Sequence, residues 1–454
     1  MTGGPFRVIE GGRTGEATPG LLIVGASEVV TLAGGIRRGP SQGEVGRLRA
    51  DDPAGPDAPA IACWEGRIAA VGPRAAVEAA LEADGLPLGR FARIDATGTA
   101  ATPGLIDPHT HLLFAGSRED ELVLRQRGAS YLDILAAGGG ILSTVAATRA
   151  ASDGELLAHG RRWLDEMLGH GVTTVEAKSG YGLDLETELR LIDVAVRLGS
   201  EGPVDVVPTW LGAHAVPPEF RARPDGTEAF VRYLVDEQLP GIVAHGRARF
   251  ADVFCETGVF SADQSRRILE AARGFGLLPR LHADELAPSG GAELAAELLA
   301  ASADHLATPS AEGIAAMAAA ADADEAVVAT LLPITTWFLM KDHHAPARAF
   351  VDAGVPVAIG TDFNPGTSPS PSLPLAMSFA CIELGLSPDE VLSAVTINAA
   401  RALSLEDDIG SLEPGKAADI VLWRVPTTAR IPYHPGVDLV RTVIKRGRVV
   451  VDRP

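Results

Sequence analysis

The sequence predicts a (β/α)8 TIM barrel with a small β-sandwich domain built from both chain ends. Three observations lead to this fold class. Between residues 102 and 405, short apolar runs alternate with amphipathic helical segments, and their number is about eight, as a closed barrel requires. Strand-rich segments lie before and after this section. No Gly-x-Gly-x-x-Gly motif follows an early strand, which argues against an open doubly wound sheet.

The first predicted part of the sandwich is residues 1–101. Residues 1–18 are Gly-rich and show no clear period, which predicts a loose tail. Strand-like runs occur at 21–24 and 29–32, and 61–71 predicts a hairpin that turns at Glu65-Gly66. Residues 37–60 are rich in Gly, Pro, Asp and Arg. This composition predicts an inserted, mobile surface loop.

Residues 406–454 form the second predicted part of the sandwich. Apolar or alternating runs occupy 419–423 and 442–451, the latter around Gly447. Neither end of the chain is long enough to form a good sheet core alone. Both ends are therefore expected to build one β-domain, with the barrel at 102–405 inserted between them.

The barrel strands are predicted from apolar runs, and the helices from their capping residues. Ser152 with Glu155 and Ser261 with Gln264 form capping boxes before apolar stripes, and Pro388 opens another helix. The predicted strands begin with Leu105-Ile106 and continue at 172–178, 204–209, 251–256, 277–282, 303–306, 327–332 and 355–362.

Bulk composition limits the possible partners. The formal charge of −20 argues against nucleic acid and against an anionic membrane, because both attract basic surfaces. No uncharged apolar run is long enough to cross a bilayer. Three widely spaced cysteines favour a reducing, cytoplasmic location over a disulfide framework.

Histidines at predicted strand ends indicate a metal site. His109 and His111 lie two residues apart, so on an extended strand they face the same side. Alone, such a pair can equally meet water or a carbonyl group. However, His282, His305 and Asp362 close three further predicted strands, and barrel active sites lie at that end. Three of these imidazoles and the carboxylate suit one divalent or trivalent ion.

Two glutamates refine this prediction. Glu285 follows His282 by three residues, and beside a metal its carboxylate can take a proton from water. Otherwise it would be a first-turn helix carboxylate. The fourth strand ends in Glu256 and offers no lysine that could bridge two metals. A single ion is therefore expected.

The motif at 103–111, Asp362 and the ending at 409–421 resemble the amidohydrolase superfamily. Four further motifs are more specific: Phe-Ala-Gly-Ser-Arg at 114–118, Glu-Ala-Lys-Ser-Gly-Tyr-Gly at 176–182, Leu-Gly-Ala-His-Ala at 211–215 and Gly-Thr-Asp-Phe-Asn-Pro-Gly at 360–366. Through them the chain resembles, within that superfamily, the imidazolonepropionase family, which opens the ring of 4-imidazolone-5-propanoate in histidine degradation.

The resemblance implies specific roles and a homodimer. It implies one Zn²⁺ or Fe³⁺ per subunit, with ligands His109, His111, His282 and Asp362. Glu285 would be the base and His305 would lie near the reacting carbonyl. Our own hypothesis for the mechanism is that Glu285 or Asp362 returns the proton to the departing nitrogen. Substrate contacts would come from Arg118, Tyr181, His214, Glu285, Asn364, Gly366 and Thr367.

The residues themselves leave alternatives open. Arg118 has a planar fork suited to a substrate carboxylate, but Ser-Arg-Glu-Asp at 117–120 also suits a surface ion pair. Tyr181 and His214 can reach the pocket or serve their own loops. Asn364-Pro365-Gly366-Thr367 can be only a turn, or its backbone N–H groups can hold a carboxylate. Lys178 is expected to be structural, paired with Glu176 or a neighbouring strand end.

Two other functions compete with this prediction. Another cyclic amidase or a nucleobase deaminase would share the metal ligands, so Arg118, Tyr181 and the Asn364 turn decide in favour of a carboxylate-bearing substrate. A non-catalytic barrel used as a scaffold is the second rival. The complete ligand set with Glu285 argues against it.

Overall fold

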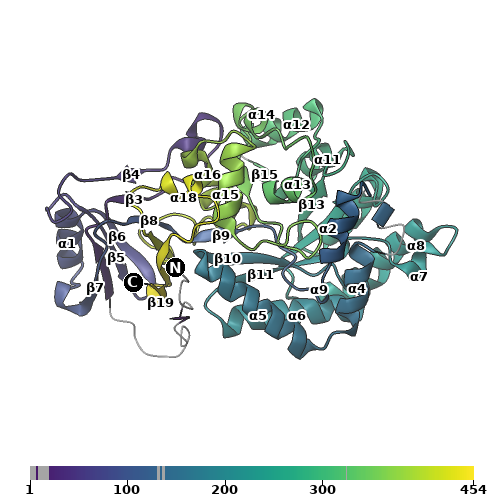
Figure 1. Cartoon of the computed structure of the whole chain (residues 1–454), viewed down its shortest axis with the longest axis horizontal. Helices are drawn as coiled ribbons and strands as arrows, with labels where there is room; N and C mark the ends of the chain where they lie inside the picture. Colours follow the sequence, from purple (N-terminus) through teal and green to yellow (C-terminus); the bar gives the residue numbers. More distant parts are fainter. Residues whose placement is uncertain (1–6, 9–19, 130–132, 135–138, 324, 454) are drawn as a thin grey trace.

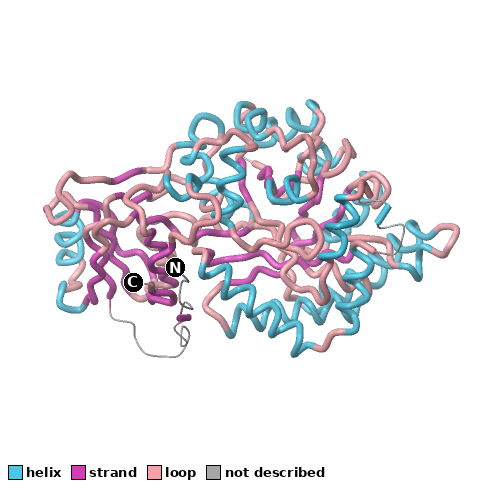
Figure 2. The backbone as a smooth tube through the Cα atoms, in the orientation of Figure 1, coloured by secondary structure: helices cyan, strands magenta, loops and turns pink. Residues whose placement is uncertain are grey.

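A computed structural model describes residues 7–8, 20–129, 133–134, 139–323 and 325–453 of the chain. Figure 1 shows two lobes, one rich in strands that holds both chain ends and one in which helices surround a sheet. Figure 2 shows the strands gathered in these two places.

The larger lobe is a parallel barrel, which confirms the predicted fold class. Its eight strands are hydrogen-bonded in chain order. Closure comes from a parallel bridge between Thr110 and Phe363, and Asp362 N donates to His109 O at 3.0 Å. The strands are β9 (Leu105–Asp107), β10 (Val172–Lys178), β11 (Asp205–Ala213), β12 (Phe250–Cys255), β13 (Leu278–Ala283), β14 (Ser302–His305), β15 (Val328–Leu331) and β16 (Val357–Ile359).

Helices cover the outside of the barrel (Figure 1). The capping boxes predicted at Ser152 and Ser261 are present, and Ser387 forms a third before Pro388. The helices of this lobe are α2 (Glu119–Gln126), α4 (Ile141–Ala150), α5 (Asp153–Gly169), α6 (Leu185–Glu201), α7 (Pro218–Arg221), α8 (Gly226–Tyr233), η3 (Leu234–Gln238), α9 (Leu239–His245), α10 (Ala262–Gly274), α11 (Gly291–Glu297), α12 (Ala311–Asp322), α13 (Pro333–Phe338), α14 (Ala347–Asp352), α15 (Leu373–Ile382), α16 (Pro388–Ala394) and α17 (Ile397–Ala402).

Two sheets form the smaller lobe, and the first combines both chain ends. Its order is β1-β19-β18-β17-β8-β3-β4, so the C-terminal β17 pairs with β8 from the N-terminal part. The second sheet has the order β6-β5-β2-β7. The elements are β1 (Arg7–Val8), β2 (Gly20–Val24), β3 (Glu28–Val30), η1 (Gly39–Gly43), β4 (Arg47–Leu48), β5 (Pro59–Trp64), β6 (Arg67–Pro73), α1 (Arg74–Ala83), η2 (Leu88–Arg90), β7 (Phe91–Asp95), β8 (Ala100–Pro103), β17 (Ile420–Trp423), α18 (Arg430–Tyr433), β18 (Val440–Lys445) and β19 (Arg448–Asp452).

One apolar core joins the two sheets of the sandwich. Ile23 and Ile61 from the second sheet pack in one cluster with Ile420 and Ile444 from the first. The hairpin predicted at Glu65-Gly66 joins β5 to β6, and both turn residues have positive φ. The boundary predicted between residues 101 and 102 falls within β8, a strand of the first sheet.

The predicted surface loop at 37–60 is present at residues 49–58, which contain no helix or strand and are largely exposed, but the prediction is wrong for residues 37–48. Within this segment, η1 and β4 pack on neighbouring elements, and β5 already starts at Pro59. Gln42 is fully buried and its side-chain amide donates to Val357 O at 2.9 Å. Asn398 Oδ1 accepts from Arg37 N at 2.8 Å. Polar side chains thus anchor the insert on the barrel, and composition alone does not reveal such partners.

No helix among the described residues is long and apolar enough to cross a membrane. Of residues 1–18, for which the sequence predicts a loose tail, the structure describes only Arg7–Val8, which pairs with β19 as β1. The others lie outside the described part of the chain.

Candidate active site

The residues predicted to bind a metal lie together at one end of the barrel. His109 and His111 follow β9, His282 lies in β13, His305 ends β14 and Asp362 follows β16. All five are buried. They meet because the strands are parallel and adjacent, so their carboxyl ends open on the same mouth.

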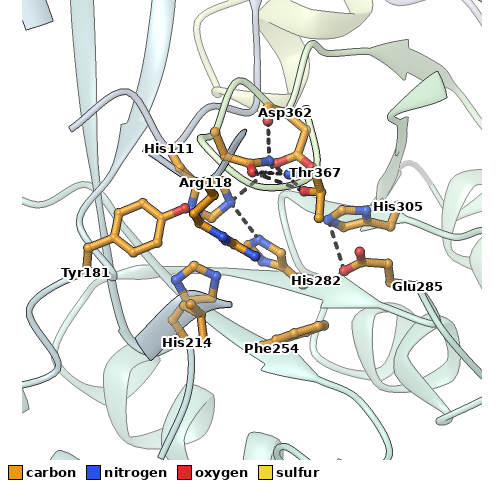
Figure 3. Close-up of a pocket in the computed structure, with 12 residues that line it drawn as sticks. His111, Arg118, Tyr181, His214, Phe254, His282, Glu285, His305, Asp362 and Thr367 are labelled. Carbon is orange, nitrogen blue, oxygen red and sulfur yellow. Dashed lines mark hydrogen bonds and ion pairs between the residues drawn. The ribbon is translucent and has the colours of Figure 1, made fainter. Parts of the chain in front are cut away.

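Their nitrogen and oxygen atoms converge on one point. Ligand atoms of His109, His111 and His282 lie within 4.8 Å of one another, as do those of His109, His305 and Asp362. Asp362 Oδ1 is 3.5 Å from His109 Nε2 and 3.4 Å from His111 Nε2. His282 Nε2 faces His111 Nε2 at 3.2 Å (Figure 3).

This arrangement fits a metal ion. His109 Nε2 and Asp362 Oδ1 are buried and have no hydrogen-bond partner within the described part of the chain. Unpaired buried polar atoms are costly, and a cation between them would satisfy both. Burial alone would raise the pKa of Asp362, but the neighbouring His109 and His111 outweigh it and hold that pKa well below its usual range. The carboxylate is thus ionised, as a ligand must be.

Carboxylates behind the imidazoles fix the ring orientations. Asp304 Oδ2 lies 2.7 Å from His109 Nδ1, and Asp252 Oδ1 lies 3.1 Å from His282 Nδ1. With Nδ1 engaged, each ring presents Nε2 to the mouth. Sequence reasoning missed both aspartates. The signal that could have found them is a charged residue within an otherwise apolar strand.

Glu285 lies where a base is needed. Its side chain is 13% exposed, and Oε2 is 3.6 Å from His305 Nε2 (Figure 3). Burial, together with the charges of Asp362 and Glu256, raises the pKa of Glu285 to about 8. Burial lowers the pKa of His305 to about 4, so this imidazole is neutral at physiological pH. A carboxyl group with a pKa close to the working pH can both accept and return a proton.

The strand ends that carry these groups have unusual backbone conformations. His305 has a φ of 77°, Asp362 of 53° and Asp284, before Glu285, of 51°. Left-handed φ values at non-glycine residues cost on the order of 1–3 kcal/mol each and cluster at functional sites. Two of these residues, His305 and Asp362, line the pocket at the barrel mouth, whereas Asp284 accepts from Ser289 N at 2.7 Å in the following loop.

Arg118 lines the same pocket as the histidines. Arg118 Nε and Nη2 donate to the Glu121 carboxylate at 3.0 Å and 2.8 Å. The ion pair that the sequence offered as an alternative role for Arg118 is therefore present. The pair is buried, however, with side-chain exposures of 5% and 9%. Glu121 therefore fixes the orientation of a pocket arginine and does not form a surface ion pair.

Tyr181 and His214 also line the pocket, beside the metal-binding cluster (Figure 3). The His214 ring stacks on His111, with 4.8 Å between ring centres. Glu188 of α6 holds the loop of Tyr181, accepting from Gly182 N at 2.8 Å. Phe254 adds an apolar wall that the sequence did not indicate.

The segment Asn364–Thr367 is a side-chain-stabilised turn. Asn364 Oδ1 accepts from Gly366 N and from Thr367 N, each at 2.8 Å. The alternative, in which these backbone N–H groups hold a carboxylate, is not supported, because the Asn364 side chain engages them. Asn364 and Thr367 line the pocket, and Gly366 packs against the guanidinium of Arg118.

Comparison with known proteins agrees with this geometry. Residues 115–451 match the model of the amidohydrolase family. The imidazolonepropionase of Geobacillus kaustophilus (strain HTA426) is 55% identical over 359 residues, 79% of this chain and 82% of the relative. That of Alkaliphilus metalliredigens (strain QYMF) is 47% identical over 95% of this chain and 98% of the relative.

The chain belongs to the imidazolonepropionase family. As an imidazolonepropionase-family amidohydrolase, it is a hydrolase acting on carbon–nitrogen bonds in cyclic amides. Solved structures share the fold. A triazine hydrolase variant aligns with a TM-score of 0.69 at 18% identity, over 96% of this chain and 95% of the other. An adenosine deaminase from Xanthomonas campestris with bound zinc aligns with a TM-score of 0.63 at 20% identity, over 94% and 92%.

Proposed function

We propose that this pocket hydrolyses the ring C–N amide bond of 4-imidazolone-5-propanoate and releases N-formimidoyl-L-glutamate, a step of histidine degradation. One observation carries the proposal. The buried, oriented guanidinium of Arg118 lines the same pocket as Glu285 and the metal-binding cluster. A small ring with a carboxylate-bearing side chain matches this pairing of a cation with hydrolytic groups.

The metal in this proposal is a single Zn²⁺ or Fe³⁺, held by His109, His111, His282 and Asp362. Three imidazole nitrogens and one carboxylate oxygen suit either ion. The end of β12 offers no lysine, and Glu256 there accepts from Leu286 N at 2.8 Å. These contacts support one ion over two. When bound, such an ion polarises a carbonyl group and makes water more acidic.

The side chains divide the work of the reaction. Arg118 binds the propanoate carboxylate, with Tyr181 and His214 beside it, and so fixes the ring over the mouth. Glu285 accepts a proton from the attacking water, whose oxygen bonds to the ring carbonyl carbon. His305 donates a hydrogen bond to the carbonyl oxygen as negative charge develops there.

Bond cleavage completes the turnover. The ring C–N bond breaks, and the nitrogen takes the proton that Glu285 received, or one passed through Asp362. The former carbonyl carbon becomes the α-carboxylate of the product. The turn of Asn364, with Gly366 and Thr367, lies at the glutamate-like end of that product. The second proton of the water leaves the new carboxyl group for the basic formimidoyl group or solvent, so atoms and charge balance without a redox partner.

The assay compares imidazolonepropanoate with cytosine, guanine and dihydropyrimidines, and metal analysis is done on the same purified protein. Turnover of imidazolonepropanoate alone is expected. Glu285→Gln should keep its metal content and lose about 10²–10⁴-fold in turnover. Glu312→Gln, at an exposed first-turn carboxylate of α12, is the matched control and should behave as wild type. Deamination of a nucleobase, or full activity of Glu285→Gln, would contradict the proposal.

The wider setting also remains a proposal. We infer a cytoplasmic homodimer without a nucleic-acid or membrane partner. The three cysteines support the location and the net charge of −20 argues against those partners, whereas the homodimer rests on the family resemblance. Light scattering of the purified protein tests the dimer.

A further inference from the structure

Lys178 is a fully buried cation beneath the active site that the proposed reaction does not use. It ends β10 and is flanked by three buried carboxylates. Its Nζ is 2.8 Å from Glu176 Oε1, 2.7 Å from Asp252 Oδ2 and 3.8 Å from Asp304 Oδ2. Burial alone would lower the pKa of Lys178, but the charges of Asp252 and Glu176 outweigh it and raise that pKa. The ammonium group is therefore charged.

Two of these carboxylates hold metal-binding histidines. Asp252 contacts both Lys178 and His282: Oδ2 lies 2.7 Å from Nζ, and both carboxylate oxygens lie 3.1 Å from Nδ1 of the ring. Asp304 Oδ2 lies 2.7 Å from His109 Nδ1. A fixed Nδ1 directs Nε2 towards the ion. One ammonium group thus lies behind two of the three ligand imidazoles, which come from different strands.

The third carboxylate acts on the backbone between His109 and His111. Glu176 Oε2 accepts from Thr110 N at 3.1 Å, and Thr110 Oγ1 donates to Glu176 O at 2.6 Å. Lys178 N donates to Thr110 O at 3.0 Å. The end of β10 therefore holds the central residue of the His-x-His segment from three sides.

A second cation makes the contribution of Lys178 specific. Arg280 Nη2 donates to Asp304 at 2.9 Å and to Pro108 O at 2.7 Å. Asp304 therefore has two cationic neighbours. Asp252 has ion pairs with Lys178 and His282, and Lys178 is the only Lys or Arg paired with it within the described residues. Loss of Lys178 should therefore change the position of the Asp252 carboxylate and, through it, the orientation of the His282 ring.

We propose that Lys178 is a positioning residue of the metal centre, holding the Asp252 carboxylate so that His282 presents Nε2 to the ion. The inference rests on the metal site of the proposed function. A competing explanation is that Lys178 only neutralises buried charge for the sake of the fold. The two explanations differ in zinc affinity. A lysine that serves only the fold changes Tm and leaves the zinc Kd of the folded protein unchanged, whereas a positioning lysine raises that Kd when it is lost and has no further effect once the Asp252 carboxylate is gone.

The test is a double-mutant cycle on zinc binding. Apo protein is titrated with Zn²⁺ against a chromophoric chelator for wild type, Lys178→Met, Asp252→Asn and the double variant. The double variant has the same net charge as wild type. Each single change should raise the zinc Kd by about 10- to 100-fold. The double variant should bind no more weakly than the weaker single variant. Circular dichroism and the Tm of the apo forms report on the fold.

Lys445→Met is the matched control. Lys445 is also a buried lysine with two carboxylates, Asp205 at 2.8 Å and Asp419 at 2.6 Å, but it lies on β18 of the sandwich. Its loss should lower Tm and leave the zinc Kd unchanged.

Several outcomes would overturn the inference. Zinc binding by Lys178→Met within twofold of wild type would do so, and so would single effects that multiply in the double variant. If Lys178→Met does not fold, the comparison of Asp252→Asn with the double variant decides, since equal Kd values are expected. A wild-type protein that binds no zinc or does not hydrolyse imidazolonepropanoate would instead refute the proposed function.

Discussion

Gly366→Ala tests whether the orientation of Arg118 sets the affinity for a carboxylate-bearing substrate. A Cβ atom at position 366 would lie 2.1 Å from Arg118 Cζ, whereas ordinary contact begins at 3.4 Å. The guanidinium would have to move by the difference of 1.3 Å. Backbone strain does not contribute, because Gly366 is not among the glycines with positive φ.

The magnitude follows from the contacts of the arginine. Glu121 holds Arg118 at 2.8 and 3.0 Å, and a displacement of more than 1 Å breaks hydrogen bonds of this length. Loss of one charged contact with the substrate costs about 1.5–3 kcal/mol. The corresponding fall in kcat/KM is about 10- to 150-fold, and it should appear mainly in KM.

Steady-state kinetics with imidazolonepropanoate measures this change. Gly89→Ala is the matched control, because a Cβ atom there meets nothing within 4 Å, and it should behave as wild type. A Gly366→Ala enzyme that is folded, binds metal and keeps the wild-type KM would refute the role given to Arg118.

Three further predictions concern the base, its loop and the ion. Burial raises the pKa of Glu285 to about 8. The base form is lost as pH falls, and a nearby cation lowers this pKa. The value of kcat/KM should therefore rise with pH along a limb whose apparent pKa lies between 4.5, the ordinary pKa of a glutamate, and about 8. Glu285→Gln should lack this limb. Glu256 accepts from Leu286 N at 2.8 Å and from Ser289 Oγ at 2.7 Å, so Glu256→Gln should loosen the loop of Glu285. We expect kcat to fall about 10- to 100-fold with little change in KM, and an unchanged kcat would contradict this role. Removing the ion with a chelator should lower the free energy of unfolding by about 2.7 kcal/mol relative to protein in metal at 100 times Kd. Calorimetry measures this difference, and equal Tm values would argue against a bound ion.

Local patterns in the sequence were sufficient to predict the positions of the helices and strands that build the barrel. The capping residues Ser152 and Ser261 start helices as predicted, because a cap hydrogen-bonds within its own first turn. Strand positions followed from apolar runs, but their ends did not: the run predicted at 355–362 contains only Val357–Ile359 as strand. Strand ends depend on which neighbours supply hydrogen bonds, and a single segment does not contain that information.

The insert at 37–60 shows where composition misleads. Its Gly, Pro and charged residues predict a loop, yet Gln42 is buried against the backbone of Val357 and Asn398 holds Arg37. These contacts join residues more than 300 positions apart. A local pattern carries no signal for them.

The sequence by itself determined the order of the strands and which histidines and carboxylates stand at their ends. In a parallel barrel the carboxyl ends of the strands open on one mouth, so residues that are far apart in the sequence lie close together there. Only the tertiary structure decided what supports the cluster. Lys178 was expected to pair with Glu176 or a neighbouring strand end, and the structure confirms that pairing and adds Asp252. Which buried charge meets which depends on strand adjacency and on the side chains that fill the barrel, and both are properties of the folded chain.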